Sequence, residues 1–327
     1  MKANKIIAGI ALVGAIAFTA TGCAGAGGGG NAGGGSGDKI TVGFAQTGSE
    51  SGWRSANTES MKEAFSEANG FNLVFNAADN KPEAQIAAVR SFINQGVDAI
   101  VLAPIVSDGW DDVLKEAKDA NIPVILEDRT VSASEDLYAS WIGLDFKKEG
   151  ETAGKWVADN FGTTPTNMVV LEGTTGSSAA TDRATGFNDA IKGTDIKVLD
   201  SQTGNFTRAD GKTVMEGFLQ KYGSQINLLF AHNDDMGLGA LEAIKAAGLK
   251  PGTDIKIVTI DAVKDGMTAL SNGEFNYIVE CNPLLGEKTA EVVKKVVAGE
   301  SVDKSYIVED QAFDQEQAKK VLDSRPY

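Results

Sequence analysis

Strand-like runs alternate with helix-like segments along most of the chain, and this alternation limits the possible folds more than any other feature. The runs rich in β-branched and aliphatic residues lie at 40–44, 72–75, 99–102, 123–126, 138–143, 168–171, 196–199, 228–231, 256–260, 276–280 and 305–308. The segments between them show helical spacing, as in Met61, Ala64, Phe65 and Ala68. Strands and helices that alternate in this way form parallel βαβ units with right-handed crossovers. The sequence therefore predicts an α/β fold with parallel sheets.

The length of the alternating region predicts two lobes rather than one. The region begins near residue 39 and runs to the C-terminus at residue 327. A single hydrophobic core rarely serves more than about 250–300 residues, and the alternating pattern breaks near residue 143. We therefore expect two Rossmann-like lobes, each with its own parallel sheet.

The N-terminal residues have the order of a secretory signal with a lipobox. Lys2 and Lys5 precede an apolar run at 6–18, and small residues at 20–22 precede Cys23. This order predicts a signal peptide over 1–22 and lipidation of Cys23. The apolar run is too short to cross a bilayer of about 30 Å as a permanent helix, although an anchor helix with an incidental cysteine is the alternative.

A glycine-rich segment follows Cys23 and predicts a tether. Residues 24–37 contain only Gly, Ala, Asn and Ser, and nine of them are Gly. Such a segment has no side chains with which to build a core and behaves as a flexible chain. We therefore expect residues 23–38 to hold an exported body at the outer face of a membrane by a lipid anchor.

Charge, cysteine and histidine content exclude several classes of function. The formal net charge of −15 becomes −17 when Lys2 and Lys5 are removed, which argues against nucleic acid as a partner. Beyond Cys23 the chain has Cys281 as its remaining cysteine, so no intrachain disulfide is expected, and His232 is its single histidine. These residues supply neither a zinc site nor a serine triad, and no nucleotide-binding motif is present. We expect no metal and no cofactor.

Polar side chains recur where the predicted strands end. In an open parallel sheet, ligands bind outside the carboxyl ends of the strands. Charged, amide and aromatic side chains follow the predicted strands at 48–54, 127–129, 182–183, 232–235 and 261, and Phe206 lies in a further loop. Asp234 and Asp235 follow a strand as well, but we assign them to helix capping.

This set of residues has the chemistry of sugar recognition. Carboxylate, amide and guanidinium groups are planar and two-pronged, so each can satisfy neighbouring sugar hydroxyls. Trp53, and secondly Phe206, can cover an apolar face of a sugar ring. The sequence therefore predicts a carbohydrate ligand.

The chain resembles the sugar-binding proteins of ABC importers, the periplasmic binding protein type I family, and within it the members that bind galactofuranose. The matching runs are 42–44, 48–54, 90–92, 95–100, 114–120, 128–129, 182–183, 206–208, 231–236 and 246–252. The Glu-Ser-Gly-Trp-Arg run at 50–54 and the His-Asn-Asp-Asp-Met run at 232–236 are not shared by ribose-binding members generally. The resemblance extends from about residue 39 to residue 300.

The resemblance implies a monomer with a three-segment hinge and a monosaccharide, galactofuranose or a galactose-like sugar, in the cleft between the lobes. It implies crossings near Gly143, Asn282 and Val302. It also implies a set of ligand contacts, to which the chemistry of sugar recognition adds Phe206: Glu50, Ser51, Gly52, Trp53, Arg54, Asp128, Arg129, Arg183, Asn233 and Asp261. The expected first lobe is 39–142 plus 283–302, and the expected second lobe is 143–282 plus 303–327. The implied partners are the membrane subunits of an ABC permease. Relatives carry a disulfide in the second lobe that this chain cannot form, and the segment after residue 303 diverges.

Two alternatives remain from the residues alone. A sugar receptor for chemotaxis or for a sensor kinase would use the same fold with a different partner. An exported glycosidase would use two carboxyl groups from among Glu50, Asp128 and Asp261. Arginines beside two of these carboxylates favour their ionised forms and argue against the glycosidase.

Overall fold

The computed structural model describes residues 39–327. The predicted signal peptide, Cys23 and the glycine-rich tether lie outside the described residues. Within 39–327, no helix combines the length and apolar character needed to cross a membrane.

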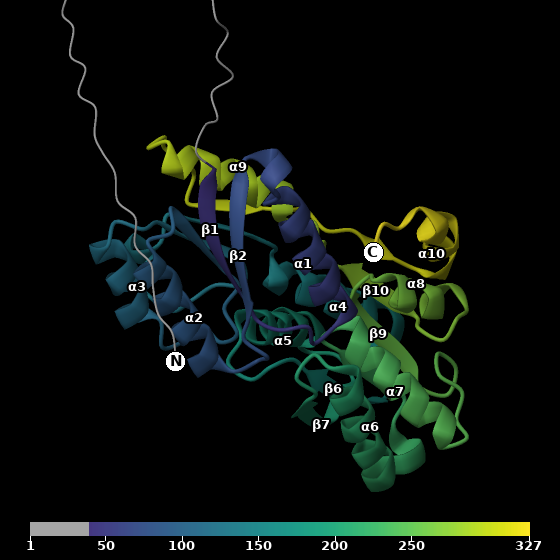
Figure 1. Ribbon diagram of the computed structural model, residues 1–327. Helices are drawn as coiled ribbons and strands as arrows, with labels where there is room; N and C mark the ends of the chain where they lie inside the picture. The colour runs from purple at the N-terminus through teal and green to yellow at the C-terminus, as the bar shows by residue number, and fades with distance from the viewer. Residues whose placement is uncertain (1–38) are drawn as a thin grey trace, which may run out of the picture. The chain divides into compact units, whose positions relative to one another are not determined.

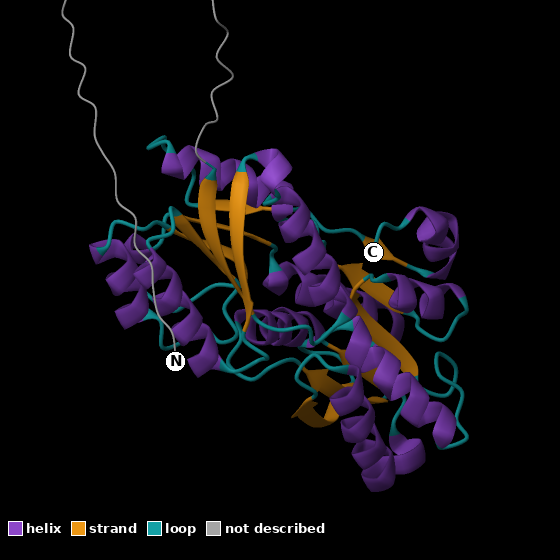
Figure 2. Cartoon of the chain, in the orientation of Figure 1, coloured by secondary structure: helices purple, strands orange, loops and turns teal. Residues whose placement is uncertain are grey.

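The first lobe is built on a six-stranded parallel sheet with the strand order β2-β1-β3-β4-β5-β11 (Figure 1). Its strands are β1 (Ile40–Gln46), β2 (Phe71–Ala77), β3 (Ala99–Leu102), β4 (Val124–Asp128), β5 (Ser140–Gly143) and β11 (Ser305–Ile307). Its helices are α1 (Gly52–Ala64), α2 (Pro82–Gln95), α3 (Asp111–Asp119) and α9 (Gly286–Val297). The α1–α9 pair and the α2–α3 pair cover the sheet from opposite sides (Figure 2).

The second lobe repeats this plan with the strand order β7-β6-β8-β9-β10-β12. Its strands are β6 (Thr166–Glu172), β7 (Ile196–Thr203), β8 (Leu228–Ala231), β9 (Lys256–Asp261), β10 (Tyr277–Glu280) and β12 (Ala312–Phe313). Its helices are α4 (Phe146–Phe161), α5 (Ser178–Ile191), α6 (Arg208–Tyr222), α7 (Asp234–Ala246), α8 (Lys264–Ser271) and α10 (Gln315–Val321). All neighbouring strands are parallel except β12, which is antiparallel to β10. The predicted α/β fold with two parallel-dominated lobes is confirmed.

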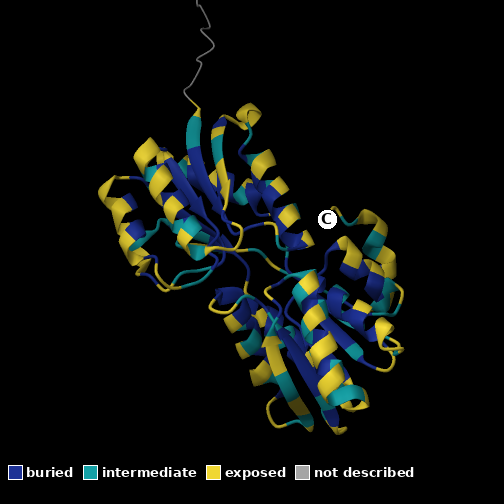
Figure 3. Ribbon diagram, turned by 60° about the horizontal axis from the view of Figure 1, so that its bottom comes forward, coloured by how far each residue is buried: buried dark blue, intermediate teal, exposed yellow. Residues whose placement is uncertain are grey.

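The cores lie between the sheets and the inner faces of their helices. The central strands β3 and β8 are buried over their whole length, whereas the outer faces of the helices are exposed (Figure 3). Local sequence sets the helix ends: α2 begins at Pro82, whose missing N–H costs nothing at a first helical position. It ends before Gly96, which has a φ of +66°.

The C-terminal segment differs from the sequence-based boundary. β11 pairs with β5 of the first sheet, and the amide of Val308 donates to the carbonyl of Gly143. The chain therefore passes to the second lobe between residue 308 and β12, not near Val302. The strand is a three-residue edge strand with Ile307 55% exposed, so its sequence carries no pattern that would select one sheet over the other.

Candidate ligand-binding site

A cavity lies at the carboxyl ends of the strands of both sheets. The first lobe lines it with Glu50, Ser51, Trp53, Arg54, Asp128 and Arg129, and the second lobe with Phe146, Ala179, Arg183, Phe206, Asn233, Asp261 and Cys281. Because both lobes contribute, neither lobe alone completes the site.

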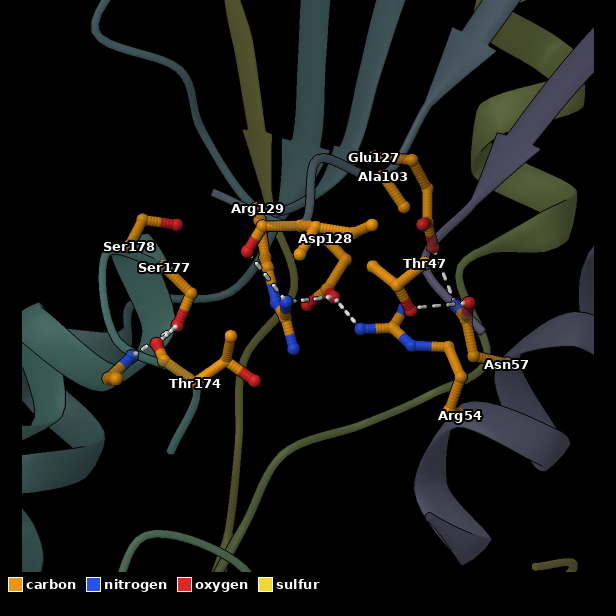
Figure 4. A network of polar contacts seen from close by, with 12 residues as sticks. Thr47, Arg54, Asn57, Ala103, Glu127, Asp128, Arg129, Thr174, Ser177 and Ser178 are labelled. Atoms are coloured by element: carbon orange, nitrogen blue, oxygen red, sulfur yellow. Dashed lines mark hydrogen bonds and ion pairs between the residues drawn. The ribbon is translucent and has the colours of Figure 1, made fainter. Parts of the chain in front are cut away.

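The first-lobe half of the site is a network of two arginines and two carboxylates, and Figure 4 labels three of its members, Arg54, Asp128 and Arg129. Arg54 Nη2 lies 2.5 Å from Asp128 Oδ2, and its Nε lies 3.1 Å from Glu50 Oε1. Arg129 approaches the same carboxylates less closely, at 3.7 Å from Asp128 Oδ2 and 3.9 Å from Glu50 Oε1. Its hydrogen bond within residues 39–327 is from Nη1 to the carbonyl of Ile105 at 3.2 Å. Arg129 therefore keeps donors that no protein atom among the described residues engages.

The second-lobe half is organised around Arg183. Its Nε donates to Glu149 Oε2 at 2.7 Å and its Nη1 to the carbonyl of His232 at 2.6 Å. Its Nη2 lies 3.8 Å from Asp261 Oδ1, beyond hydrogen-bonding distance. The other carboxylate oxygen, Asp261 Oδ2, is buried without a hydrogen-bond partner among the described residues. Arg183 and Asp261 thus also retain unused hydrogen-bonding capacity.

Aromatic rings connect the two halves. The ring of Phe206 faces the guanidinium of Arg129 at 5.1 Å and that of Arg183 at 5.9 Å, so one ring contacts cations of both lobes. The ring rests on Gly173, where an added Cβ would lie 1.9 Å from Phe206 Cζ. Trp53 lies 4.6 Å from the guanidinium of Arg54, and its Nε1 donates to the carbonyl of Cys281.

Three cavity residues have backbone conformations that L-residues rarely adopt. Asp128 has a φ of 61°, Phe206 of 63° and Asp261 of 130°. Each such conformation costs about 1–3 kcal/mol and persists where the surrounding structure imposes it. The strain therefore coincides with the strand ends that present the polar groups.

Burial and neighbouring charges shift the pKa values of the carboxyl groups in different directions. Burial opposes ionisation of Glu50, but the positive charges of Arg54 and Arg129 outweigh it and lower the pKa of Glu50. Burial raises the pKa of Asp261 well above its usual range despite the opposing charge of Arg183. Burial, with the charge of Asp128, also raises the pKa of Glu127 to about 8. The surroundings of the site therefore shift the pKa values of its carboxyl groups in opposite directions.

Ten of the eleven predicted ligand residues line this one cavity, and Gly52 does not. Ser51 and Asn233 also cap helices: Ser51 Oγ accepts from the amide of Arg54, and Asn233 Oδ1 accepts from the amide of Met236. The cap of α7 is therefore Asn233, and the assignment of Asp234 and Asp235 to capping is wrong. Asp234 instead accepts from Thr259 and Val263, and Asp235 accepts from Gly52 and Arg208.

Sequence reasoning missed five residues at or behind the cavity: Phe146, Ala179 and Cys281 in its wall, and Glu127 and Glu149 behind it. The sequence marks Cys281 only as a cysteine without a disulfide partner. Glu127 directly precedes Asp128 at a strand end, so the strand-end rule could have found it. Glu149 lies in the first turn of α4, where an acidic residue is ordinary, so it carries no comparable signal.

Comparison with known proteins agrees with the fold. Residues 42–301 match the family model described as a periplasmic binding protein domain. The galactofuranose-binding protein YtfQ of Escherichia coli is 47% identical over 260 residues, which cover 78% of this chain and 81% of YtfQ.

Two crystal structures superpose closely. A Mycobacterium smegmatis protein in complex with β-D-fucofuranose is 58% identical, with a TM-score of 0.85, covering 88% of this chain and 95% of that one. The arabinose-transporter binding protein of Shewanella sp. ANA-3, bound to α- and β-L-arabinofuranose, is 45% identical, with a TM-score of 0.84 and the same coverages of 88% and 95%. The chain belongs to the periplasmic binding protein family, as a sugar-binding protein of ABC transporters.

Proposed function

We propose that the chain binds a neutral monosaccharide in its furanose form, galactofuranose or a close relative, and delivers it to an ABC permease. One observation carries this proposal: Arg129, Arg183 and Asp261 face the cavity with hydrogen-bonding groups that no described protein atom engages. A sugar hydroxyl group both donates and accepts hydrogen bonds, so it can pair with a donor and an acceptor that lie side by side.

Charge balance favours a neutral ligand. Each of the buried guanidinium groups of Arg54, Arg129 and Arg183 already has carboxylate partners at 2.5 to 3.9 Å, drawn from Glu50, Asp128, Glu149 and Asp261. An anionic or cationic ligand would leave one of these buried charges uncompensated, which is costly. The furanose preference rests on the relatives that bind galactofuranose, fucofuranose and arabinofuranose.

Direct measurement of binding tests the ligand class. Calorimetric titration with D-fucose, L-arabinose and D-galactose should give binding to the parent protein. Asp128→Ala, Arg183→Ala and Asp261→Ala should each lower the affinity by at least about two orders of magnitude, because a buried partner is left unpaired. Asp189→Asn, at an exposed ion pair of α5 with Lys147, is the matched control and should bind like the parent. Failure of the parent to bind any of the three sugars would refute the proposal.

We further propose that the protein is a monomeric lipoprotein held at the outer face of the membrane through Cys23. The lipobox and the tether after it support this. Cys23→Ser should release the protein from membranes, while a chain beginning near Asp38 should bind sugar normally. A Cys23→Ser protein that still fractionates with membranes would contradict the lipid anchor, and mass determination in solution would check the monomer.

We also infer a binding role without catalysis. Glu50 is ionised and pairs with Arg54, and Arg54 also pairs with Asp128, so both first-lobe carboxylates have structural partners. Incubation with a chromogenic galactofuranoside should give no turnover. A sugar receptor for chemotaxis or for a sensor kinase would show the same binding, and co-purification with permease subunits would distinguish the importer.

A further inference from the structure

We propose that Asp235 is a closure latch: its carboxylate joins the second lobe to the first helix of the first lobe and sets how long the closed protein retains its sugar. The proposal rests on the proposed function, since it concerns the lifetime of the bound state. Asp235 is a positioning residue here, not a sugar contact.

The contact is direct and crosses between the lobes. Asp235, in the first turn of α7, accepts a hydrogen bond at Oδ2 from the backbone amide of Gly52 at 2.7 Å. Gly52 is the first residue of α1, 183 positions away in the sequence. The side chain of Asp235 is 8% exposed, so the bond is screened from solvent and is stronger than an exposed one.

The electrostatics of α1 favour an anion at this place. The first amides of a helix lack partners within the helix, and the aligned peptide dipoles leave positive charge there. Ser51 caps the amide of Arg54, and no acidic residue stands in the first turn of α1. Asp235 therefore supplies from the second lobe the negative charge that the first lobe lacks.

Arg208 holds the latch in position. Its Nε donates to Asp235 Oδ1 at 3.2 Å, and its Nη2 lies 2.9 Å from Asp265 Oδ2. Each oxygen of Asp235 thus has its own partner, one in each lobe. Arg208 is the first residue of α6 and follows Phe206 by two residues, so the residue that holds the latch adjoins the loop that carries the aromatic residue of the cavity.

Neither member of the latch reaches the ligand. Asp235 and Gly52 are both outside the cavity lining. Their bond therefore stabilises closure by the same amount whichever sugar is bound. Removing it should speed sugar release without changing the order of preference among sugars, because only the closed state loses a contact.

Other bonds between the lobes give an internal comparison. Ser107 donates its amide to the carbonyl of Gly176 at 2.9 Å, and Thr130 donates its amide to Ser178 Oγ at 3.1 Å. These bonds join neutral groups. A hydrogen bond between neutral groups is roughly half as strong as one to an ionised group. Ser178→Ala should therefore increase the release rate less than Asp235→Ala.

The test is stopped-flow measurement of sugar association and release, with D-fucose and L-arabinose as probes. Asp235→Ala should raise the release rate roughly tenfold to a hundredfold and leave the association rate within about twofold. The ratio of the two affinities should stay that of the parent. Asp265→Ala is the matched control, since it removes the other acidic partner of Arg208 and makes no contact with Gly52; it should release sugar like the parent.

Three results would overturn the latch: an unchanged release rate in Asp235→Ala, a changed preference between the two sugars, or an equal effect in Asp265→Ala. Each of these leaves binding by the parent intact, so it refutes the latch alone. A parent that binds neither sugar refutes the proposed function and the latch with it. Thermal unfolding of the sugar-free variants excludes a folding defect, because a latch variant should unfold at the temperature of the parent.

Discussion

The indole Nε1 of Trp53 donates a hydrogen bond to the main-chain carbonyl of Cys281 at 2.6 Å. Trp53 lies in the first turn of α1, and Cys281 directly follows β10, where the chain returns from the second lobe to the first. The same indole is 4% exposed and lines the cavity. One side chain therefore both forms the cavity wall and fixes it to the segment through which the chain returns from the second lobe to the first.

Substitution of Trp53 should separate these two roles. Trp53→Phe keeps an aromatic face but removes the donor, so sugar affinity should fall by about 0.5–1.5 kcal/mol. Trp53→Ala also removes the ring and should lose more, roughly 1–3 kcal/mol. Calorimetry with D-fucose checks both, and Trp156→Phe, whose ring stacks on Tyr277 outside the cavity, should bind like the parent. Equal losses in Trp53→Phe and Trp53→Ala would show that the ring face contributes nothing.

Removal of Arg183 should destabilise the fold in a way that depends on pH. Arg183→Ala leaves Glu149, which is 2% exposed, without its charged partner. An unpaired buried charge costs about 3–5 kcal/mol, and the Glu149 carboxyl escapes this cost by binding a proton. Urea unfolding should therefore show a larger loss at pH 8 than at pH 5. The double variant Arg183→Ala/Glu149→Gln should show a flatter profile, and Arg90→Ala, at an exposed ion pair with Glu116, should change little at either pH.

The sequence predicts the strands, the two lobes and most of the cavity because these depend on local patterns. Alternating strands and helices determine the sheets, and parallel strands bring their carboxyl ends to one edge. Asp128 and Asp261, the last residues of β4 and β9, can therefore be placed in the site from their positions alone. The segments that escaped prediction are short: β12 has two residues, and α8 and α10 have eight and seven.

The role of Asp235 could not be predicted, since it depends on a contact between distant segments. Two acidic residues after a strand are typical of a helix cap, yet Asn233 takes the cap with a φ of −153° and a ψ of 167°. Asp235 then points across to Gly52. The pairing of Glu149 with Arg183, 34 residues apart, is equally invisible to any local pattern.

Gly173→Ala should lower sugar affinity without removing a polar group. An added Cβ would lie 1.9 Å from Phe206 Cζ, so the ring must move and its contacts with Arg129 and Arg183 must change. Gly217→Ala is the matched control, because α6 leaves open space at that position. It should stabilise the fold by about 0.5–1 kcal/mol through helix propensity and leave binding intact. Parent-like affinity in Gly173→Ala would mean that the placement of Phe206 is irrelevant to binding.

His232 should make the fold less stable as the pH falls. Burial, with the charge of Arg183, lowers the pKa of His232 from 6.5 to about 3. Its Nδ1 accepts from the amide of Gly173 at 3.3 Å, which requires the neutral ring. Between pH 6.5 and 3 the unfolded chain binds a proton that the folded protein excludes.

This difference in proton binding lowers the free energy of unfolding by about 1.4 kcal/mol for each pH unit below 6.5. The loss of stability therefore reaches about 2 kcal/mol at pH 5. Above pH 6.5 both states are neutral and His232 contributes no pH dependence. His232→Asn keeps an acceptor for Gly173 and cannot titrate. Urea unfolding of the two proteins from pH 8 to pH 4 should give a difference that is constant above pH 7 and moves in favour of the variant below pH 6. A difference that stays constant down to pH 4 would mean that His232 is protonated in the folded protein as readily as in the unfolded chain.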